Sequence, residues 1–511
     1  MGRTHVSEVE SGDRARTEQL VGVGVTWKLA GQVAVQSTRL ITVAILARFL
    51  TPADYGTAAV AIALASFAFQ VSDMGIGAAL VQTEKAPRAV RSTAFWASVA
   101  VGFGLLLLSI VLSKPVAAFM GEPQVAGMVI AGGLIFAIYS LGSANQAVFM
   151  REMRFRSIEL RNWIGLGTGS LIAISAAVAG AGAWALVLQQ IAYLGTFVAA
   201  LWWRPGWRPA LTFSRSVFRD LWSFAIRIAG GRWARLAELL VVTLLIGRLA
   251  SVADLGAWSF ATSMVILPMS MIVIPISEVL FSAFSRMRDE PERISALWLN
   301  GMAYLAALLL PLMFGLIVVS PDLIPTLFGS RWEVSVSIVQ ILSLAVIIRG
   351  LQSWGSIYLD ASGRPEVTWW TQLASLCLTP VAVLTGVHWG IDGIAVCYVA
   401  CQMIAVEIPI FVIVVSQMQV SPRTVASRLA GVAMATIVMT VACIIARSAL
   451  EAAGIGMAAR AALTIGVGVA VYLPALWWLA PRVSRPVGAI AMRRLRSPFD
   501  VRRRPVTESP T

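Results

Sequence analysis

Ionisable side chains inside long apolar stretches are the residues of this sequence that could do chemistry. They are Lys28, Arg39, Asp73, Arg227, Arg232, Arg235, Glu238, Glu278, Arg349 and Glu407. A charge is costly to hold in lipid, so each of these residues is a candidate for binding or moving a ligand. The basic members suit an anion, because the arginine guanidinium has a fixed charge and a fork of donors that matches phosphate oxygens.

The spacing of these charges predicts that they gather on two helices. Lys28 and Arg39 are eleven residues apart, which is about 20° around a helix of 3.6 residues per turn, so they share one face. Arg227 and Glu238 have the same spacing in a later stretch, with two further arginines between them. We predict that facing helices enclose a positively biased cavity for a phosphate or pyrophosphate, lined by Lys28, Arg39, Arg227, Arg232 and Arg235.

Two acidic residues are candidates for ion coupling. Asp73 lies in the segment VSDMGIG, where a carboxylate could relay a proton or hold Na⁺. A local hydrogen bond at a helix end loosened by glycine explains Asp73 equally well. Glu238 is the second candidate, and its alternative role is to pair with Arg235 one turn earlier.

The basic residues also have an alternative explanation. Salt bridges between helices would account for the arginines, and Lys28 could extend its amine to the membrane surface. Glu278 and Glu407 lie near the ends of their apolar stretches, and we interpret them as structural.

The elements that must position these charges are membrane-spanning helices. The chain is 58% hydrophobic and 13% charged, with a mean hydropathy of +0.79, whereas soluble domains carry about 25% charged residues. A span needs about 20 apolar residues, and barrel strands would alternate instead of being continuously apolar. We therefore predict an all-α polytopic membrane protein of about 14 transmembrane helices, over residues 25–47, 56–80, 91–113, 124–148, 158–180, 183–203, 222–247, 255–280, 295–319, 334–358, 366–388, 390–415, 424–447 and 457–480.

An internal repeat predicts how these helices are grouped. Residues 46–56 read LARFLTPADYG and residues 246–256, at a distance of 200 positions, read IGRLASVADLG. An even number of spans per copy makes the copies parallel, with their symmetry axis along the membrane normal. We predict two six-helix lobes in parallel repeat plus two C-terminal helices. The predicted units are a cytoplasmic tail (1–20), an N-lobe (21–220), a C-lobe (221–415), two final helices (416–482) and a basic tail (483–511).

The repeat also predicts a local role for two acidic residues. Asp54 and Asp254 stand at the start of the second and eighth spans, each two residues before a glycine. A carboxylate at a helix start stabilises the free N–H groups there, so we expect both residues to act as helix caps.

Motifs for other chemistry are missing from the sequence. It has no glycine-rich loop ending in Lys-Ser/Thr, no HExxH and no GxSxG. The two histidines, His5 and His388, are too few for a metal site, and the four cysteines fall inside predicted spans. We expect neither enzyme activity nor a cofactor or metal. The remaining function is transport, driven by an ion gradient or by consumption of the transported product.

The basic residues also predict orientation. Most lysines and arginines fall on the side of the two termini, which places both termini in the cytoplasm. We expect the protein in the cell inner membrane. The arginine-rich C-terminal tail would lie on anionic lipid headgroups, so the net charge of +14 does not require a nucleic acid partner.

Several motifs resemble one known family. The motif LARFLTPADYG followed by SDMGIGAALVQ is similar to the N-terminal signature of the bacterial polysaccharide flippase family. That family is the oligosaccharide-exporting branch of the multidrug/oligosaccharidyl-lipid/polysaccharide exporter superfamily. Residues 150–163, MREMRFRSIELRNW, and the stretch at 253–287 resemble later parts of that family. The resemblance covers roughly residues 20 to 415, and Val252 departs from the Pro52 of the first copy.

The resemblance implies a function. A member would move polyprenyl-pyrophosphate-linked oligosaccharide repeat units from the cytoplasmic to the periplasmic leaflet by alternating access. These units would serve the biosynthesis of exopolysaccharide, capsule or the O-antigen of lipopolysaccharide. The implied partners are membrane lipids, a coupling H⁺ or Na⁺, and the polysaccharide polymerase and chain-length machinery.

Three alternatives stay open. A multidrug/cation antiporter of the same superfamily would favour acidic residues within its spans, whereas this chain has more basic ones. A lipid II flippase would also be cationic. A membrane scaffold for polysaccharide assembly would not need charges buried within the spans.

Overall fold

The computed structural model describes residues 35–72, 88–152, 154–203, 205, 207–286 and 290–484, and within them it contains helices and no strand. A helix over residues 35–49 comes first. The first half of the molecule, residues 35–203, continues with α2 (Pro52–Ser72), α4 (Arg88–Met120), α5 (Val125–Arg151), α6 (Phe155–Val178) and α7 (Trp184–Trp203).

The second half, residues 215–417, has longer and more irregular helices. It consists of α8 (Arg215–Leu249), α9 (Val252–Arg286), α10 (Pro291–Phe328), α11 (Val334–Ala361), α12 (Pro365–Gly386), α13 (Gly390–Gln402) and α14 (Ile408–Gln417). The short helices η1 (Ser330–Trp332) and η2 (Val387–Trp389) are 3₁₀ turns, and the π turn η3 (Met403–Glu407) joins α13 to α14. A final hairpin consists of α15 (Pro422–Ala452) and α16 (Met457–Leu479).

The fold confirms the predicted all-α polytopic class. A helix runs through the described part of each of the fourteen predicted spans, apart from a few residues at their ends. Nine helices in the described part are long and apolar enough to cross a membrane. The protein is therefore a multi-pass membrane protein.

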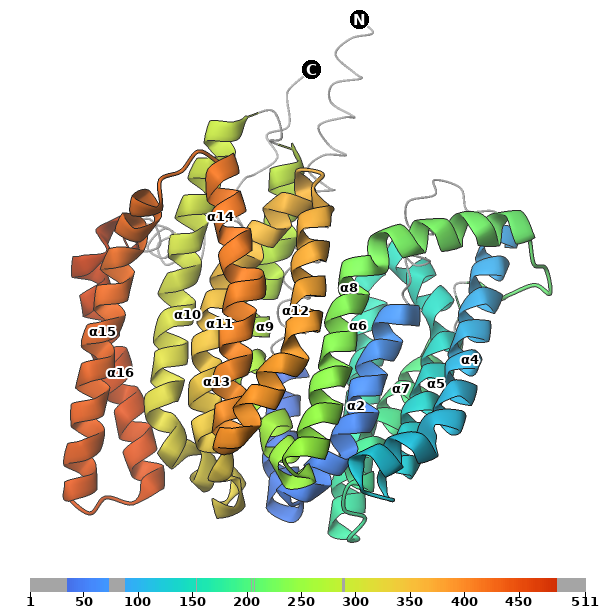
Figure 1. Cartoon of the computed structure of the whole chain (residues 1–511), viewed down its shortest axis with the longest axis horizontal. Helices are drawn as coiled ribbons and strands as arrows, with labels where there is room; N and C mark the ends of the chain where they lie inside the picture. The colour runs from blue at the N-terminus through green and yellow to red at the C-terminus, as the bar shows by residue number, and fades with distance from the viewer. Residues whose placement is uncertain are drawn as a thin grey trace, which may run out of the picture.

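The halves lie side by side, and the hairpin packs at the far edge (Figure 1). In the first half α4 packs on α5 and α6 on α7, and in the second half α9 packs on α11 and α12 on both α8 and α13. The hairpin packs against α10. The halves meet mainly where α2 crosses α9 and contacts α8.

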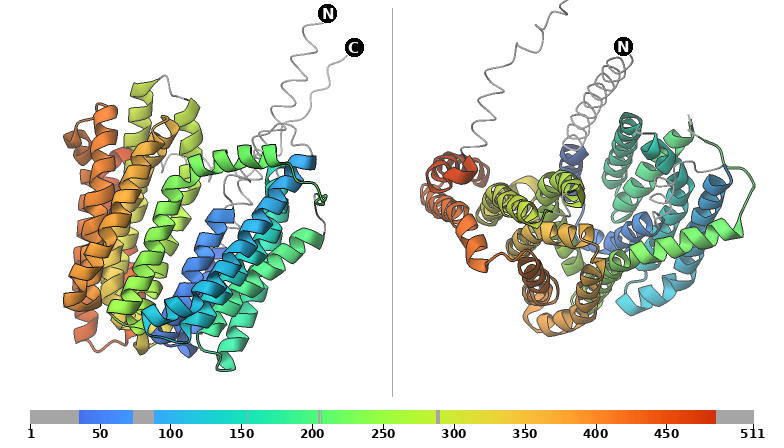
Figure 2. Two further views of the ribbon diagram at one scale, coloured as in Figure 1. Left: turned by 45° about the vertical axis from the view of Figure 1, so that its right-hand side comes forward. Right: turned by 90° about the horizontal axis from the view of Figure 1, so that it is seen from above.

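Helix α8 begins earlier than the predicted span 222–247, and its first turns run across one end of the bundle before it descends (Figures 1 and 2). Polar contacts hold the preceding segment on α4. Ser92 and Thr93 accept hydrogen bonds from the backbone N–H groups of Ala210 and Ser214 at 3.0 Å. The element that carries Arg235 is therefore anchored on the first half and packs into the second.

The crossing of α2 and α9 explains the sequence repeat. A Cβ added to Gly56 would lie 1.7 Å from the carbonyl oxygen of Val252, and one added to Gly256 would lie 1.7 Å from that of Pro52. Each glycine therefore lets the other copy's backbone approach. The departure of Val252 from Pro52 is harmless here, because both residue types present the same carbonyl oxygen.

The starts of α2 and α9 are capped alike. The Asp54 carboxylate accepts hydrogen bonds from the Thr51 N–H at 2.8 Å and the Thr51 hydroxyl at 2.7 Å. Asp254 accepts one from the Ser251 hydroxyl at 2.6 Å, and its own N–H donates back to that hydroxyl at 3.0 Å. At α2 these bonds belong to a capping box, which confirms the predicted capping role of Asp54. At α9 the Ser251 hydroxyl caps the Asp254 N–H, and the Asp254 carboxylate supports that hydroxyl.

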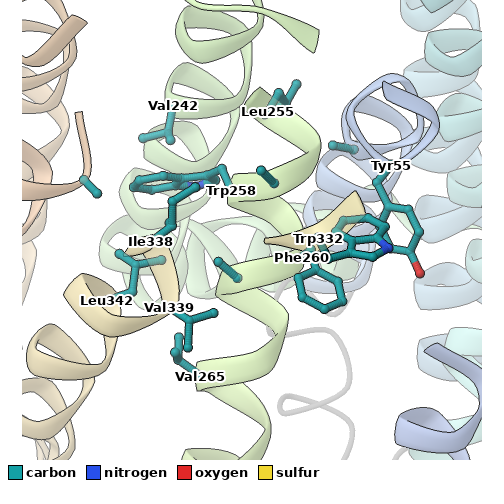
Figure 3. Packing of buried hydrophobic residues seen from close by; sticks show 14 of the residues in the cluster. Tyr55, Val242, Leu255, Trp258, Phe260, Val265, Trp332, Ile338, Val339 and Leu342 are labelled. Carbon is teal, nitrogen blue, oxygen red and sulfur yellow. The ribbon is translucent and has the colours of Figure 1, made fainter. Parts of the chain in front are cut away.

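Aromatic side chains fill the same end of the interface between the halves (Figure 3). Tyr55 on α2 meets Trp332 edge-on, with ring centroids 4.8 Å apart. Phe260 on α9 stacks on Trp332 at 4.3 Å and meets Phe328 at 4.9 Å. Such rings exclude water and add about 0.5–1.5 kcal/mol per pair beyond the area that they bury, so this end is closed.

Hydrogen bonds add to this closure. The Arg48 guanidinium donates to the carbonyl oxygen of Leu327 at 3.0 Å and to that of Thr326, both in the last turn of α10. The Trp332 indole N–H donates to the Ala47 carbonyl at 3.0 Å. The last turn of α10 thus receives a cation from the other half, which suits the negative end of its dipole.

The hairpin is fixed to α10 by a buried carboxylate. Asp322 accepts hydrogen bonds from the guanidinium groups of Arg447 at 2.6 Å and Arg460 at 2.8 Å. Asp322 is 1% exposed. One carboxylate therefore binds two arginines at the end of the hairpin where α15 turns into α16, and Glu451 lies 3.6 Å from Arg460 as a second acidic partner.

Candidate functional site

Arg235 on α8 is surrounded by charged and polar groups. It is within electrostatic range of Arg349 on α11, Tyr398 on α13, Glu407 in the π turn, and Glu238 one turn along its own helix. The Arg235 side chain is exposed all the same. Because its neighbours belong to the interior of the second half, we infer that this exposed guanidinium faces open space within the bundle and not the lipid.

Glu238 is held by neutral partners from two neighbouring helices. Its carboxylate is 4% exposed and accepts hydrogen bonds from the Gln402 amide and from the Thr379 hydroxyl, the latter at 3.3 Å. Gln402 also donates to the Ser375 hydroxyl at 2.8 Å. A buried carboxylate needs such partners, and they bring α8, α12 and α13 together at this point.

Glu407 completes the set. It ends the π turn, is 5% exposed, and lies in electrostatic range of Arg235 and Arg349. Its carbonyl oxygen accepts a hydrogen bond from the Gln352 amide at 3.0 Å. Single π turns within α-helices frequently mark functional sites. The sequence interpretation treats Glu407 as structural, whereas its position beside two arginines makes it part of the charged set.

The set carries two guanidinium groups and two carboxylates, but they differ in exposure. Arg235 is exposed and Arg349 half-buried, whereas Glu238 and Glu407 are both buried. The accessible surface of the set is therefore cationic even though its charges balance. Two neighbouring guanidinium groups also repel each other, and an anion bound between them would relieve that repulsion.

Arg39 belongs to a separate set in the first half. Its side chain is exposed and lies in electrostatic range of Tyr193 on α7. The Tyr193 hydroxyl donates to the Asn162 amide oxygen on α6 at 2.7 Å, and Glu159 lies near the same tyrosine. No interaction given for the described residues joins Arg39 to Arg235. These two predicted site residues thus line different halves.

The other predicted site residues cannot be placed as fully. Lys28 and Asp73 lie outside the described residues. Arg227 and Arg232 lie on α8, and Glu278 lies on α9, but their side chains are outside the described part. Among the described residues, no cluster of His, Cys, Asp and Glu side chains could hold a metal ion.

Sequence spacing misses several members of the set around Arg235. Arg349 is one of the ionisable residues inside predicted spans, but its spacing gives no reason to place it beside α8. Tyr398, Thr379 and Gln402 are not charged, so they carry no signal in an inventory of ionisable groups. A search for amides and hydroxyls inside the same spans would have found all three.

Comparison with known proteins bears on these observations. The family model described as polysaccharide biosynthesis protein matches residues 45–337, which is more than half of the chain. The chain belongs to this family of polysaccharide biosynthesis proteins. The match includes the α2–α9 crossing, Arg235 and Glu238.

Relatives of the polysaccharide biosynthesis family resemble the chain over most of its length. It is 27% identical over 369 residues to the succinoglycan biosynthesis transport protein ExoT of Rhizobium meliloti (strain 1021), covering 72% of this chain and 74% of the relative. It is 25% identical to the teichuronic acid biosynthesis protein TuaB of Bacillus subtilis (strain 168), covering 73% and 78%. It is 22% identical to the lipopolysaccharide biosynthesis protein WzxC of Escherichia coli (strain K12), covering 76% of this chain and 80% of WzxC.

Solved structures share the fold of this member of the polysaccharide biosynthesis family. The lipid II flippase MurJ in an inward closed conformation aligns with a TM-score of 0.68 at 12% identity, covering 91% of this chain and 98% of MurJ. An inward-facing multidrug resistance transporter of the MATE family aligns with a TM-score of 0.58 at 14% identity, covering 76% and 98%. These transporters share the helix arrangement, and at this identity the likeness concerns the fold alone.

Proposed function

We propose that this protein is a flippase for polyprenyl-pyrophosphate-linked oligosaccharide repeat units, which it moves from the cytoplasmic to the periplasmic leaflet for surface polysaccharide biosynthesis. The observation that carries the proposal is a set of two arginines, Arg235 exposed and Arg349 half-buried, within electrostatic range of buried carboxylates in the second half. A pyrophosphate headgroup is an anion whose oxygens match two guanidinium forks. The relatives named for exopolysaccharide, teichuronic acid and lipopolysaccharide biosynthesis support the substrate class.

The proposed binding set combines this pair with the basic residues of the predicted span 25–47 and of α8. Arg235 would hold the pyrophosphate with Arg227 and Arg232 of the same helix, and Arg39 and Lys28 would present charge from the first half. Transport by alternating access then requires the halves to separate at the closed α2–α9 end. The aromatic seal around Trp332 is the contact that must open.

Coupling to an ion is the next part of the proposal. Glu238 and Asp73 are the candidate acidic residues, with H⁺ or Na⁺ as the coupling ion. Glu238 is buried among donors of α12 and α13, so a change in its charge would alter the packing of α8 on both helices. The protein would lie in the cell inner membrane with both termini in the cytoplasm, and would pass its product to polymerase and chain-length machinery.

Reconstitution in liposomes tests the substrate. The purified chain is offered labelled polyprenyl-pyrophosphate oligosaccharide, lipid II, or a labelled drug cation, and appearance in the opposite leaflet or lumen is measured. We expect only the oligosaccharide to cross at a rate above protein-free liposomes. Exclusive movement of lipid II or of the drug cation would replace the proposal by the corresponding rival, and no movement of any substrate would support a scaffold.

Cells supply the matching test of the site. Replacing Arg232 and Arg235 together by glutamine should leave the protein folded in the membrane but stop polysaccharide export. Arg248→Gln is the matched control, because Arg248 is an exposed arginine at the far end of the same helix. Unimpaired polymer output from the double variant would reject the assignment of these arginines.

A further inference from the structure

The C-terminal hairpin has arginines at both ends of its two helices. On α15 the stretch between Arg428 and Arg447 contains no charged residue, and at 1.5 Å per residue these arginines are about 28 Å apart. Arg460 and Arg482 likewise bracket an uncharged stretch of about 33 Å around α16. A bilayer has a hydrocarbon core about 30 Å thick, so Arg447 and Arg460 lie at one headgroup level and Arg428 and Arg482 at the other.

The arginines at the two ends of the hairpin have different partners. At one end Arg447 and Arg460 share the buried carboxylate of Asp322. At the other end Arg428 and Arg482 line one cavity, and none of the described residues that line it is acidic. Arg428 donates to the neutral Asn300 amide oxygen at 3.3 Å. The second pair therefore has a cavity where the first pair has a carboxylate.

The cavity lies between α10, α15 and the segment that follows α16. Its volume is about 310 Å³, at the lower end of ordinary ligand sites. Gly431 allows this shape, because a Cβ there would lie 2.3 Å from the Leu479 carbonyl oxygen, so the end of α16 packs directly on the α15 backbone. Besides these residues and the two arginines, the lining is formed by Asn300, Ala303, Tyr304, Ser427, Ala480, Pro481 and Val483.

The surroundings of this cavity indicate where its ligand comes from. Trp477 and Trp478 are 48% and 81% exposed, a few residues before Arg482. Tryptophans gather at the headgroup level of membranes, which agrees with the position deduced from the arginine spacing. Leu479 at the end of α16 lines the cavity and is exposed as well. An occupant with a charged head and apolar chains would match both features.

We propose that this cavity binds the phosphate group of an anionic phospholipid from the surrounding bilayer, with Arg428 and Arg482 as its ligands. The lipid phosphate supplies the negative charge that Asp322 supplies at the opposite end of the hairpin. Its acyl chains run along the exposed apolar surface that begins at Leu479, at the end of α16. The site is separate from the charged set around Arg235 and does not depend on the transported substrate.

Lipid binding to the purified full-length protein in detergent tests this site. Phosphatidylglycerol or phosphatidylcholine is titrated in, and bound lipid is counted by native mass spectrometry, with thermal melting as a parallel readout. We expect phosphatidylglycerol to bind more tightly than phosphatidylcholine and to raise the melting temperature. The variant Arg428→Gln with Arg482→Gln should bind phosphatidylglycerol roughly thirtyfold more weakly, from about fivefold per arginine near a lipid surface.

Two further variants control for charge and for folding. Arg423→Gln removes an exposed arginine from the start of the same helix without touching the cavity, so its phosphatidylglycerol affinity should equal that of the wild type. The pair Arg428→Lys and Arg482→Lys keeps both charges and should retain most of the binding. If the double glutamine variant unfolds at a low temperature without lipid, the double lysine variant decides the test. A double lysine variant that folds but binds no phosphatidylglycerol would contradict recognition by charge.

Several results would overturn the proposal. Equal binding of phosphatidylglycerol by the wild type and by a folded glutamine pair would exclude the two arginines as ligands. Equal affinity for phosphatidylcholine would exclude recognition of negative charge. Millimolar inorganic phosphate that raises the melting temperature as much as phosphatidylglycerol does would show a site for free phosphate and not for a lipid.

Discussion

The α2–α9 crossing and the charged set around Arg235 relate differently to the internal repeat. At the crossing, residues 200 positions apart have the same role: Gly56 and Gly256 admit each other's backbone. The charged set has no such symmetry. The residue 200 positions before the exposed Arg235 is Val35, which is buried. The residue 200 positions after Arg39 is Leu239. The equal eleven-residue spacings on the two helices are thus not equivalent positions.

The difference has a physical cause. Two parallel copies that touch across their own symmetry axis make the same contact twice, so a requirement for glycine in one copy is a requirement in the other. A bound headgroup has no such symmetry, and its ligands can come mainly from one half. Repeat positions therefore identify the joint between the halves, and the proposed ligand site lies where the two copies depart from the repeat.

Filling the crossing should have the largest effect. In Gly56→Val the new side chain would meet the Val252 carbonyl oxygen, which lies 1.7 Å from the position of its Cβ. The helices must separate, which should cost about 3 kcal/mol or more and should abolish transport. Gly256→Val should behave alike, because the geometry is reciprocal. Thermal melting of the purified variants and flipping in liposomes measure the two effects.

A glycine in open space provides the control for this prediction. Nothing lies within 4 Å of a Cβ added to Gly315 in α10, so Gly315→Ala should leave melting and transport unchanged or raise stability slightly. A Gly56→Val protein that melts and flips like the wild type would mean that the crossing is not a close contact in the membrane.

Neutralising the two accessible arginines of the charged set should come next. Arg235→Gln and Arg349→Gln should each lower flipping at least tenfold, since a hydrogen bond to a charged group contributes about 1.5–3 kcal/mol. Melting should change little, because both side chains are at least partly exposed. The readout is the initial flipping rate in liposomes at limiting substrate. Loss of folding in place of transport would instead identify the arginines as structural salt-bridge partners.

The buried acidic partner should have a smaller and more specific effect. Glu238→Gln keeps the volume and can still accept from Gln402 and Thr379, so we expect melting to change by less than about 1 kcal/mol. If Glu238 couples transport to an ion, flipping in the variant should no longer respond to an imposed H⁺ or Na⁺ gradient. The measurement compares flipping with and without each gradient, beside Glu451→Gln at an exposed residue. If flipping by Glu238→Gln still responds to a gradient, Glu238 is not the residue that couples transport to the ion.

The fold could be predicted from this sequence to a greater extent than the site. An apolar run of about 20 residues can be recognised from neighbouring positions alone, so helices run through the described part of each predicted span, and nine helices there could cross a membrane. The sequence does not predict the start of α8, which is held along α4 by Ser92 and Thr93. The spacing of charged residues along one helix predicts which of them share a face, but it does not predict which residues of other helices pack against that face. Helix packing brings Arg349 of α11, and Tyr398 and Gln402 of α13, to the set around Arg235. Periodicity within a single helix cannot predict such contacts between helices.

The smallest predicted effect compares the two copies of one repeat residue. Both arginines are exposed, but Arg48 donates to the last carbonyl oxygens of α10, whereas its counterpart Arg248 at the end of α8 makes no such bond among the described residues. Arg48→Gln removes a cation from a helix C-terminus and should cost about 0.5–1 kcal/mol. Arg248→Gln should change stability by less than about 0.5 kcal/mol. Thermal melting of both variants measures the difference, and equal losses would mean that this repeat residue acts in its own half and not by joining the halves.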